Sequence, residues 1–151
     1  MILNRKKHCI AVGKHGGKLR DLAHQVKTGD KAAILSAAIL MSSMVPQNAT
    51  LVPIPSNEGD ATYTYDIANA ISKIRGVPVV DAIQGFSRES SHEAKLQGRR
   101  INSKVWFYKI ENVSEDSQVV FIDNCVATGK TCEAARKALG NRGYTLSITL
   151  A

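Results

Sequence analysis

The sequence predicts a single α/β domain built on a mainly parallel β-sheet, and three observations point to it. Apolar runs typical of buried strands alternate along the chain with segments of helical periodicity. Gly and Pro residues separate these segments at short intervals. A length of 151 residues suits one domain with a full hydrophobic core. We therefore expect one domain over residues 1–151, with helices on both faces of the sheet.

Each element follows from a local pattern. The expected order is helix 19–26, helix 31–44, strand 51–54, helix 65–74, a β-rich segment 77–83, strand 105–110, strand 119–123, helix 133–139 and strand 144–150. Asp30 can cap the second helix, and Gly76 follows the third helix as its stop. Ile74 is the last of four residues expected to face inward from that third helix. Residues 84–100 are polar and charged without an apolar face, which predicts a loop or a marginal helix.

Charge and cysteine content narrow the range of partners. The formal net charge of +7 favours anionic partners such as phosphorylated small molecules, nucleic acid or an acidic protein, although a solvated basic surface gives the same count. Cys9, Cys125 and Cys132 form no Cys-x-x-Cys pair, which argues against a disulfide framework or a zinc site and fits a cytoplasmic protein. The apolar stretch 32–45 is too short to span a membrane and holds three serines, so we expect a buried helix and no membrane partner.

The segment from Val119 to Cys132 carries the chemistry. Four apolar residues run directly into the acid–amide pair Asp123 and Asn124, and a loop of small and hydroxyl residues leads to a helical run. In a strand–loop–helix step, free backbone N–H groups and the positive end of the helix surround one point, which suits a phosphate. The pair alone also fits an ordinary strand-ending turn. Together with the loop it indicates a sugar phosphate, whose hydroxyl groups the pair could hold.

The same loop invites comparison with P-loop NTPases because it contains Gly129, Lys130 and Thr131. That motif needs a glycine at position 124. This chain has Asn124 there, preceded by Asp123, and a carboxylate at that point would repel a polyphosphate. A P-loop is therefore disfavoured.

The residues from Val120 to Thr131 resemble the phosphoribosyl-diphosphate motif of type I phosphoribosyltransferases, in which an apolar strand, two acids and a few residues precede Thr-Gly-x-Thr. Over nearly its whole length the chain resembles the ComF family of competence-associated proteins within that superfamily. The further segments that carry this resemblance are Gly17 to Arg20, Lys27 to Asp30, Val52 to Pro55, and the later residues Arg88, Gln97, Arg99 or Arg100, Asn102 and Phe107. The family's N-terminal zinc-ribbon cysteines are absent.

The resemblance implies a type I phosphoribosyltransferase fold with a small hood formed by the N-terminal part of the chain and a lid. It also implies roles for particular residues. The 5′-phosphate loop would consist of Ala127, Thr128, Gly129, Lys130 and Thr131. Asp123 and Asn124 would be the catalytic pair and would accept hydrogen bonds from the ribose hydroxyls. The pyrophosphate would be bound by Pro55, Ser56 and Asn57, and by Arg88, Lys95, Arg99 and Arg100 in or beside the lid.

The resemblance further implies substitution at the anomeric carbon of phosphoribosyl diphosphate, with pyrophosphate leaving. Mg²⁺ would bind through substrate and water, with Asp123 as a possible direct ligand. Two residues depart from the superfamily's pattern: Asn124 replaces the second acid, and Ala127 cannot act as an acid or base. The sequence therefore also supports a non-catalytic ligand-sensing or DNA-uptake assembly module, with a nucleotide as an alternative ligand. A homodimer is common among such relatives. Single-stranded DNA binding is permitted by the charge but disfavoured by the scarcity of aromatic residues.

Overall fold

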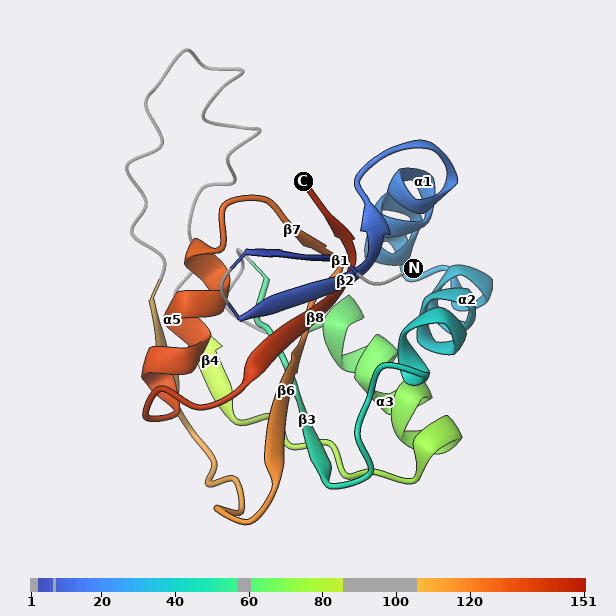
Figure 1. Ribbon diagram of the computed structural model, residues 1–151. Coiled ribbons are helices and arrows are strands. Elements are labelled where there is room, and N and C mark those ends of the chain that lie inside the picture. Colours follow the sequence, from blue (N-terminus) through green and yellow to red (C-terminus); the bar gives the residue numbers. More distant parts are fainter. Residues whose placement is uncertain (1–2, 7, 57–60, 86–105) are drawn as a thin grey trace.

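The computed structural model describes residues 3–6, 8–56, 61–85 and 106–151 (Figure 1). The chain begins with β1 (Leu3–Lys6), β2 (Cys9–Lys14), α1 (Gly17–Gln25), the 3-10 turn η1 (Val26–Thr28), α2 (Lys31–Ser42), β3 (Ala49–Pro53) and α3 (Tyr63–Arg75). It continues with β4 (Ile83–Gly85), β5 (Phe107–Lys109), β6 (Gln118–Ile122), β7 (Cys125–Val126), α5 (Lys130–Ala138) and β8 (Tyr144–Leu150). From α1 onward the order of the larger helices and strands follows the prediction, whereas β1, β2 and β7 were not predicted.

The main sheet has the strand order β1-β2-β8-β6-β3, and β7 pairs separately with β8. All of these pairs are parallel except β1 with β2, which form an antiparallel edge. The central strands pair at Leu51 with Val120 and at Val120 with Tyr144. Strands β4 and β5 form a small antiparallel sheet of their own. The predicted fold class, an α/β domain with a mainly parallel sheet, is confirmed.

Helices cover both faces of this sheet, as expected. Figure 1 shows α2 and α3 on one side and α5 on the other. The larger core lies under α1, α2 and α3, where Ile67 and Ile71 meet Ile122 and Leu146 of the strands. The second core lies under α5 and contains Phe121. All five of these side chains are fully buried. Burying a large apolar side chain stabilises a fold by about 1.5–3 kcal/mol, so these two layers fix the strand ends that form the candidate site.

Local signals set the helix ends where the sequence placed them. The Asp30 carboxylate accepts hydrogen bonds from the N–H groups of Ala32 and Ala33, at 3.0 and 3.5 Å. Gly76 ends α3 in the left-handed conformation at φ 71°, a backbone region that glycine enters without a steric penalty. Both caps were predicted from residue type alone, because each depends only on its own neighbours in the chain.

Two expectations about burial were wrong. Ile74 is 46% exposed, because the last turn of α3 extends beyond the sheet. Helix α2 is apolar all round, and it leaves Leu35, Ile39 and Leu40 between 42% and 57% exposed on the side away from α3. No helix in the described ranges is long and apolar enough to cross a membrane.

The N-terminal part of the chain corrects a further expectation. We expected it to contribute to a hood, but β1 and β2 instead extend the main sheet, with Cys9 opposite Thr145 and Gly13 opposite Thr149. Helix α1 then lies beside the end of β8, close to the chain's C-terminus (Figure 1). The lid expected around residues 86–100 lies outside the described residues.

Candidate functional site

Two neighbouring strands end together at the edge of the sheet where the motif lies. Pro53 is paired with Ile122, and the Ile54 N–H donates to the Ile122 carbonyl at 3.0 Å. The Thr64 hydroxyl at the start of α3 donates to the Ile54 carbonyl at 2.7 Å and holds this strand end in place. Buried Pro55 and half-buried Ser56 therefore follow β3 next to Asp123, which follows β6. Ligands of open parallel sheets bind at this kind of edge.

The predicted phosphate loop forms the turn between β7 and α5. Gly129 has φ 87° and is the N-cap of α5, a helix of nine residues. Its left-handed backbone turns the chain sharply into the helix, and the first N–H groups of a helix have no partner within it. The side chains of Thr128 and Lys130 are exposed, and the Thr128 hydroxyl accepts a hydrogen bond from the Lys130 N–H at 3.4 Å. Ala127 is exposed and Thr131 half-buried, so the mouth of the turn is open to a ligand.

Asp123 lies at the inner end of this loop and is half-buried. Its carboxylate accepts a hydrogen bond from the Asn124 N–H at 2.8 Å, which turns the chain as it leaves β6. Its own N–H donates to the Leu146 carbonyl at 3.1 Å, so β8 holds the backbone of Asp123. The carboxylate is thereby positioned between the phosphate loop and the end of β3.

The structure gives Asn124 a different role from the one implied by the resemblance. Its side chain is 4% exposed, and its amide nitrogen donates to the Ala23 carbonyl of α1 at 2.9 Å. Its amide oxygen accepts from the Tyr63 hydroxyl of α3 at 3.5 Å. Because both ends of the amide are engaged by the protein, Asn124 joins α1 and α3 to the loop.

A cluster that sequence reasoning missed lies on the other side of Asp123. His15 follows β2, and its Nδ1 atom is 2.9 Å from the Thr149 hydroxyl and 3.5 Å from the Cys125 sulfur. Its ring centroid lies 5.6 Å from that of His24 on α1. Burial, followed by the nearby charges of His24, Arg20 and Lys27, lowers the pKa of His15. Burial raises the pKa of the Cys125 thiol, so at neutral pH the two side chains meet uncharged.

Two further cysteines are buried near the start of α5. Cys132, in the first turn of α5, lies with Cys9 of β2 in a small apolar cluster, and both are free thiols. A hydrogen bond from Cys9 is the main cause that lowers the pKa of Cys132 to about 6. This contact connects strand β2 to the helix that carries the phosphate loop.

The remaining predicted site residues lie outside the described residues. They are Asn57 of the pyrophosphate loop and the basic residues Arg88, Lys95, Arg99 and Arg100. Within the described ranges, no group of three or more His, Cys, Asp or Glu side chains is arranged to hold a metal ion.

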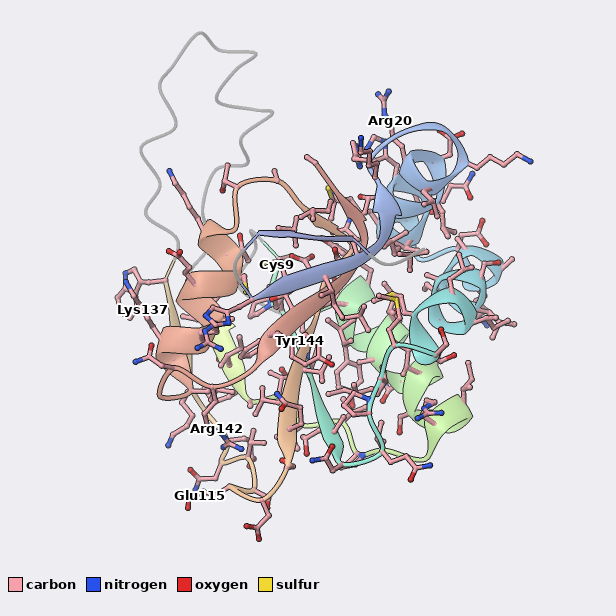
Figure 2. All side chains as sticks on the ribbon, in the orientation of Figure 1. Cys9, Arg20, Glu115, Lys137, Arg142 and Tyr144 are labelled. Atoms are coloured by element: carbon pink, nitrogen blue, oxygen red, sulfur yellow. The ribbon has the colours of Figure 1, made fainter. Side chains whose placement is uncertain are left out.

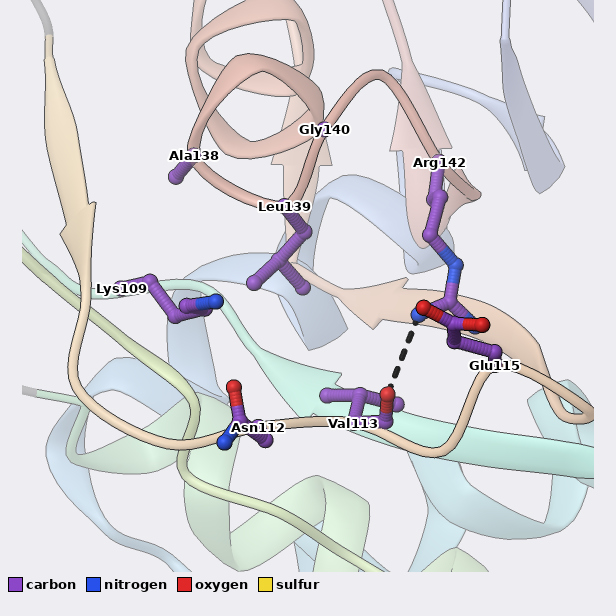
Figure 3. Close-up of a pocket in the computed structure, with 8 residues that line it drawn as sticks. All are labelled: Lys109, Asn112, Val113, Glu115, Ala138, Leu139, Gly140 and Arg142. Atoms are coloured by element: carbon purple, nitrogen blue, oxygen red, sulfur yellow. Dashed lines mark hydrogen bonds between the residues drawn. The ribbon is translucent and has the colours of Figure 1, made fainter.

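A cavity lies away from the candidate site, near the opposite end of the strands, where β6 begins (Figure 3). It measures about 510 Å³ and lies between the end of α5 and the segment from Lys109 to Glu115. Arg142 lines it but donates to the carbonyls of Val113, Ser114 and Ser117 at 2.7 to 3.1 Å. The guanidinium thus holds the loop before β6, and this cavity takes no part in the predicted site.

Comparisons with known proteins are sparse. No family model matches the chain, and neither does any curated protein. Among solved structures, that of Leishmania donovani UMP synthase aligns with 86% of this chain at 21% identity, with a TM-score of 0.44. The chain spans 22% of the length of that protein.

Proposed function

We propose that the chain binds phosphoribosyl diphosphate at the edge formed by the ends of β3 and β6, and transfers its ribose 5-phosphate to a nitrogen acceptor with release of pyrophosphate. The observation that carries this proposal is the turn after Asp123. A left-handed glycine caps a nine-residue helix, and the hydroxyl and ammonium groups on either side of it are exposed. A phosphate monoester in this turn would receive backbone N–H groups and the positive end of α5.

The proposed orientation of the sugar follows from that anchor. With its 5′-phosphate at Thr128 to Thr131, the ribose would extend toward Asp123, whose carboxylate can accept hydrogen bonds from ring hydroxyls. The pyrophosphate would extend toward Ser56, the described residue that follows β3 on the other side of Asp123. Substitution at the anomeric carbon then needs little covalent chemistry from the protein, which positions groups and offsets charge.

We propose Mg²⁺ as the accompanying ion, because it offsets the charge of a departing pyrophosphate and usually retains water and substrate ligands. The protein's part is to hold Asp123 beside that position. A cytoplasmic location and a homodimer remain part of the proposal, as does membership of the ComF-like branch of type I phosphoribosyltransferases.

A second function is favoured by the position of Asn124. The absence of the second acid removes charge that would stabilise a developing cation, and the amide connects the ligand loop to α1 and α3. A ligand at Asp123 could therefore move helices without being converted. In that case the chain is a sensing or assembly module, and the ComF resemblance suggests DNA uptake as its setting.

Calorimetric titration with phosphoribosyl diphosphate and Mg²⁺ tests the pocket. We expect saturable binding, and we expect Thr128→Val to weaken it about tenfold, since a hydrogen bond to a charged group contributes roughly 1.5–3 kcal/mol. Thr28→Val is the matched control, because Thr28 is exposed and its hydroxyl donates to the Gln25 carbonyl of the same helical segment. Equal affinity in both variants would remove the loop from the site. Release of pyrophosphate in the presence of acceptors then separates an enzyme from a sensor.

A further inference from the structure

Helix α1 presents a cationic face at the candidate site. Arg20, His24 and Lys27 are spaced four and three residues apart, which places them on one side of the helical segment α1–η1. All three are exposed, whereas Ala23 and Val26 on the inner side are fully buried. Figure 2 shows the Arg20 side chain beside α1, pointing outward from the molecule. The segment is therefore apolar toward the core and basic toward its outer edge.

Two contacts join this face to the segment that follows Asp123, and the pKa shifts of His15 and Cys125 agree with them. The His24 ring lies 5.6 Å from that of His15, and His15 touches Cys125, two residues beyond Asp123. After burial and His24, the charges of Arg20 and Lys27 also lower the pKa of His15. Besides burial, which raises the pKa of the Cys125 thiol most, the charge of Asp123 raises that pKa and the charge of Lys27 lowers it. The cationic face and the catalytic carboxylate thus converge on the same residue.

The position of α1 is fixed by the hydrogen bond from Asn124. The Ala23 carbonyl that accepts it lies within the stretch between Arg20 and Lys27. The His15 N–H also donates to the Leu150 carbonyl at 3.1 Å, which holds the turn before α1 against β8. Because the donor Asn124 is buried, this bond holds the backbone of α1 next to the residue that follows Asp123.

We propose that this face is the acceptor subsite and that the acceptor is a small nitrogen compound carrying a carboxylate; this rests on the proposed function. The sugar phosphate would occupy the phosphate loop and Asp123, and the pyrophosphate would lie toward Ser56. Among the described residues, the side left for the acceptor is the one where His15, Arg20, His24 and Lys27 lie. A neutral base gains little from the two cations Arg20 and Lys27, whereas a carboxylate gains charge-assisted hydrogen bonds, including the paired bonds that a guanidinium forms.

Among the described residues, no acid is among the groups that lower the pKa of His15. Asp21 is the one acid in α1, and Asp30, three residues after Lys27, caps α2. Asp123 would be occupied by the sugar hydroxyls. The subsite therefore selects acceptors that carry a negative charge at one end, and the nitrogen at the acceptor's other end faces the sugar.

The test uses matched pairs of probes that differ in one carboxylate: orotate with uracil, and nicotinate with nicotinamide. Each is titrated against the protein saturated with phosphoribosyl diphosphate and Mg²⁺, and binding is followed by ligand-detected NMR. We expect at least one acid to bind about tenfold more tightly than its neutral partner, or roughly 1.4 kcal/mol. Arg20→Ala should abolish that difference and leave the affinity for phosphoribosyl diphosphate unchanged. Lys18→Ala, an exposed change of equal charge on the same helix, should preserve it.

Three outcomes would overturn the proposal. Acids and neutral partners could bind equally, or none of the four could bind at millimolar concentration while the sugar diphosphate does. Arg20→Ala could instead weaken phosphoribosyl diphosphate, which would assign the face to the pyrophosphate. Failure of the wild-type chain to bind phosphoribosyl diphosphate at all is a different result, because it removes the proposed function itself.

Discussion

Replacing Asn124 by aspartate separates the sequence-based expectation from the structural one. In the sequence, Asn124→Asp restores the second acid of the superfamily's motif, and turnover would be expected to rise. In the structure, the same change removes the N–H donor that serves the Ala23 carbonyl and places a carboxylate against it. We therefore expect the variant to lose stability and to gain no activity.

The magnitude follows from the burial of the site. Leaving one buried carbonyl without its donor costs about 1–3 kcal/mol, and an uncompensated charge costs more. A total of roughly 2–4 kcal/mol corresponds to a fall in melting temperature of about 6–12 °C for a domain of this size. Asn48→Asp is the matched control, because Asn48 is exposed and the charge change is the same.

The loss should also depend on pH in a defined direction. Burial raises the pKa of the new carboxyl above its value of about 3.9 in the unfolded chain. The protonated acid can donate to Ala23, so the penalty is absent below the unfolded pKa and grows as pH rises through the folded pKa. Thermal unfolding at pH 5 and pH 7.5 should show a smaller difference from the wild type at the lower pH. A melting temperature equal to that of Asn48→Asp at both values would refute the reasoning.

Two other predictions concern folding. Gly143→Ala should destabilise the chain by about 2–4 kcal/mol in denaturant titration, because a methyl group there would lie 2.8 Å from the Val119 carbonyl oxygen. Gly140 also has a positive φ, but a methyl group there meets nothing within 4 Å, so Gly140→Ala should cost only about 1–2 kcal/mol. Equal losses in the two variants would contradict the close approach at position 143. His15 has a lowered pKa, so the unfolded chain binds its proton first and stability should fall as pH decreases below about 6.5. Between pH 7.5 and pH 5.5, the unfolding midpoint of the wild type should fall further than that of His15→Asn. An equal fall in both proteins would exclude His15 as a source of the pH dependence.

Local signals explain how much of the fold was predictable. The caps at Asp30 and Gly76 and the turn at Gly129 each depend on residues within a few positions, so residue type alone located them. The strand 118–122 and the helix that follows were predicted from a short window for the same reason. The predicted helix started at residue 133 rather than 130, because small and hydroxyl residues of the loop also form its first turn.

Contacts between distant segments explain what was missed. Strand β2 is only six residues long, and its place beside β8 depends on pairing across more than 130 residues, from Cys9 to Thr145. The role of Asn124 could not be inferred from the motif, because its partners come from α1 and α3, far away in the chain. The histidine cluster was missed for the same reason, since His15 and Thr149 have no sequence spacing that links them.

The central claim, that the turn around Gly129 receives a phosphate monoester, is tested most directly by amide chemical shifts. In a ¹⁵N-labelled sample titrated with ribose 5-phosphate, we expect the largest and saturable shifts at the N–H groups of Gly129, Lys130 and Thr131. Inorganic phosphate should move the same signals more weakly. If these three amides stay unmoved at millimolar ribose 5-phosphate while others shift, the phosphate site lies elsewhere and the account is wrong.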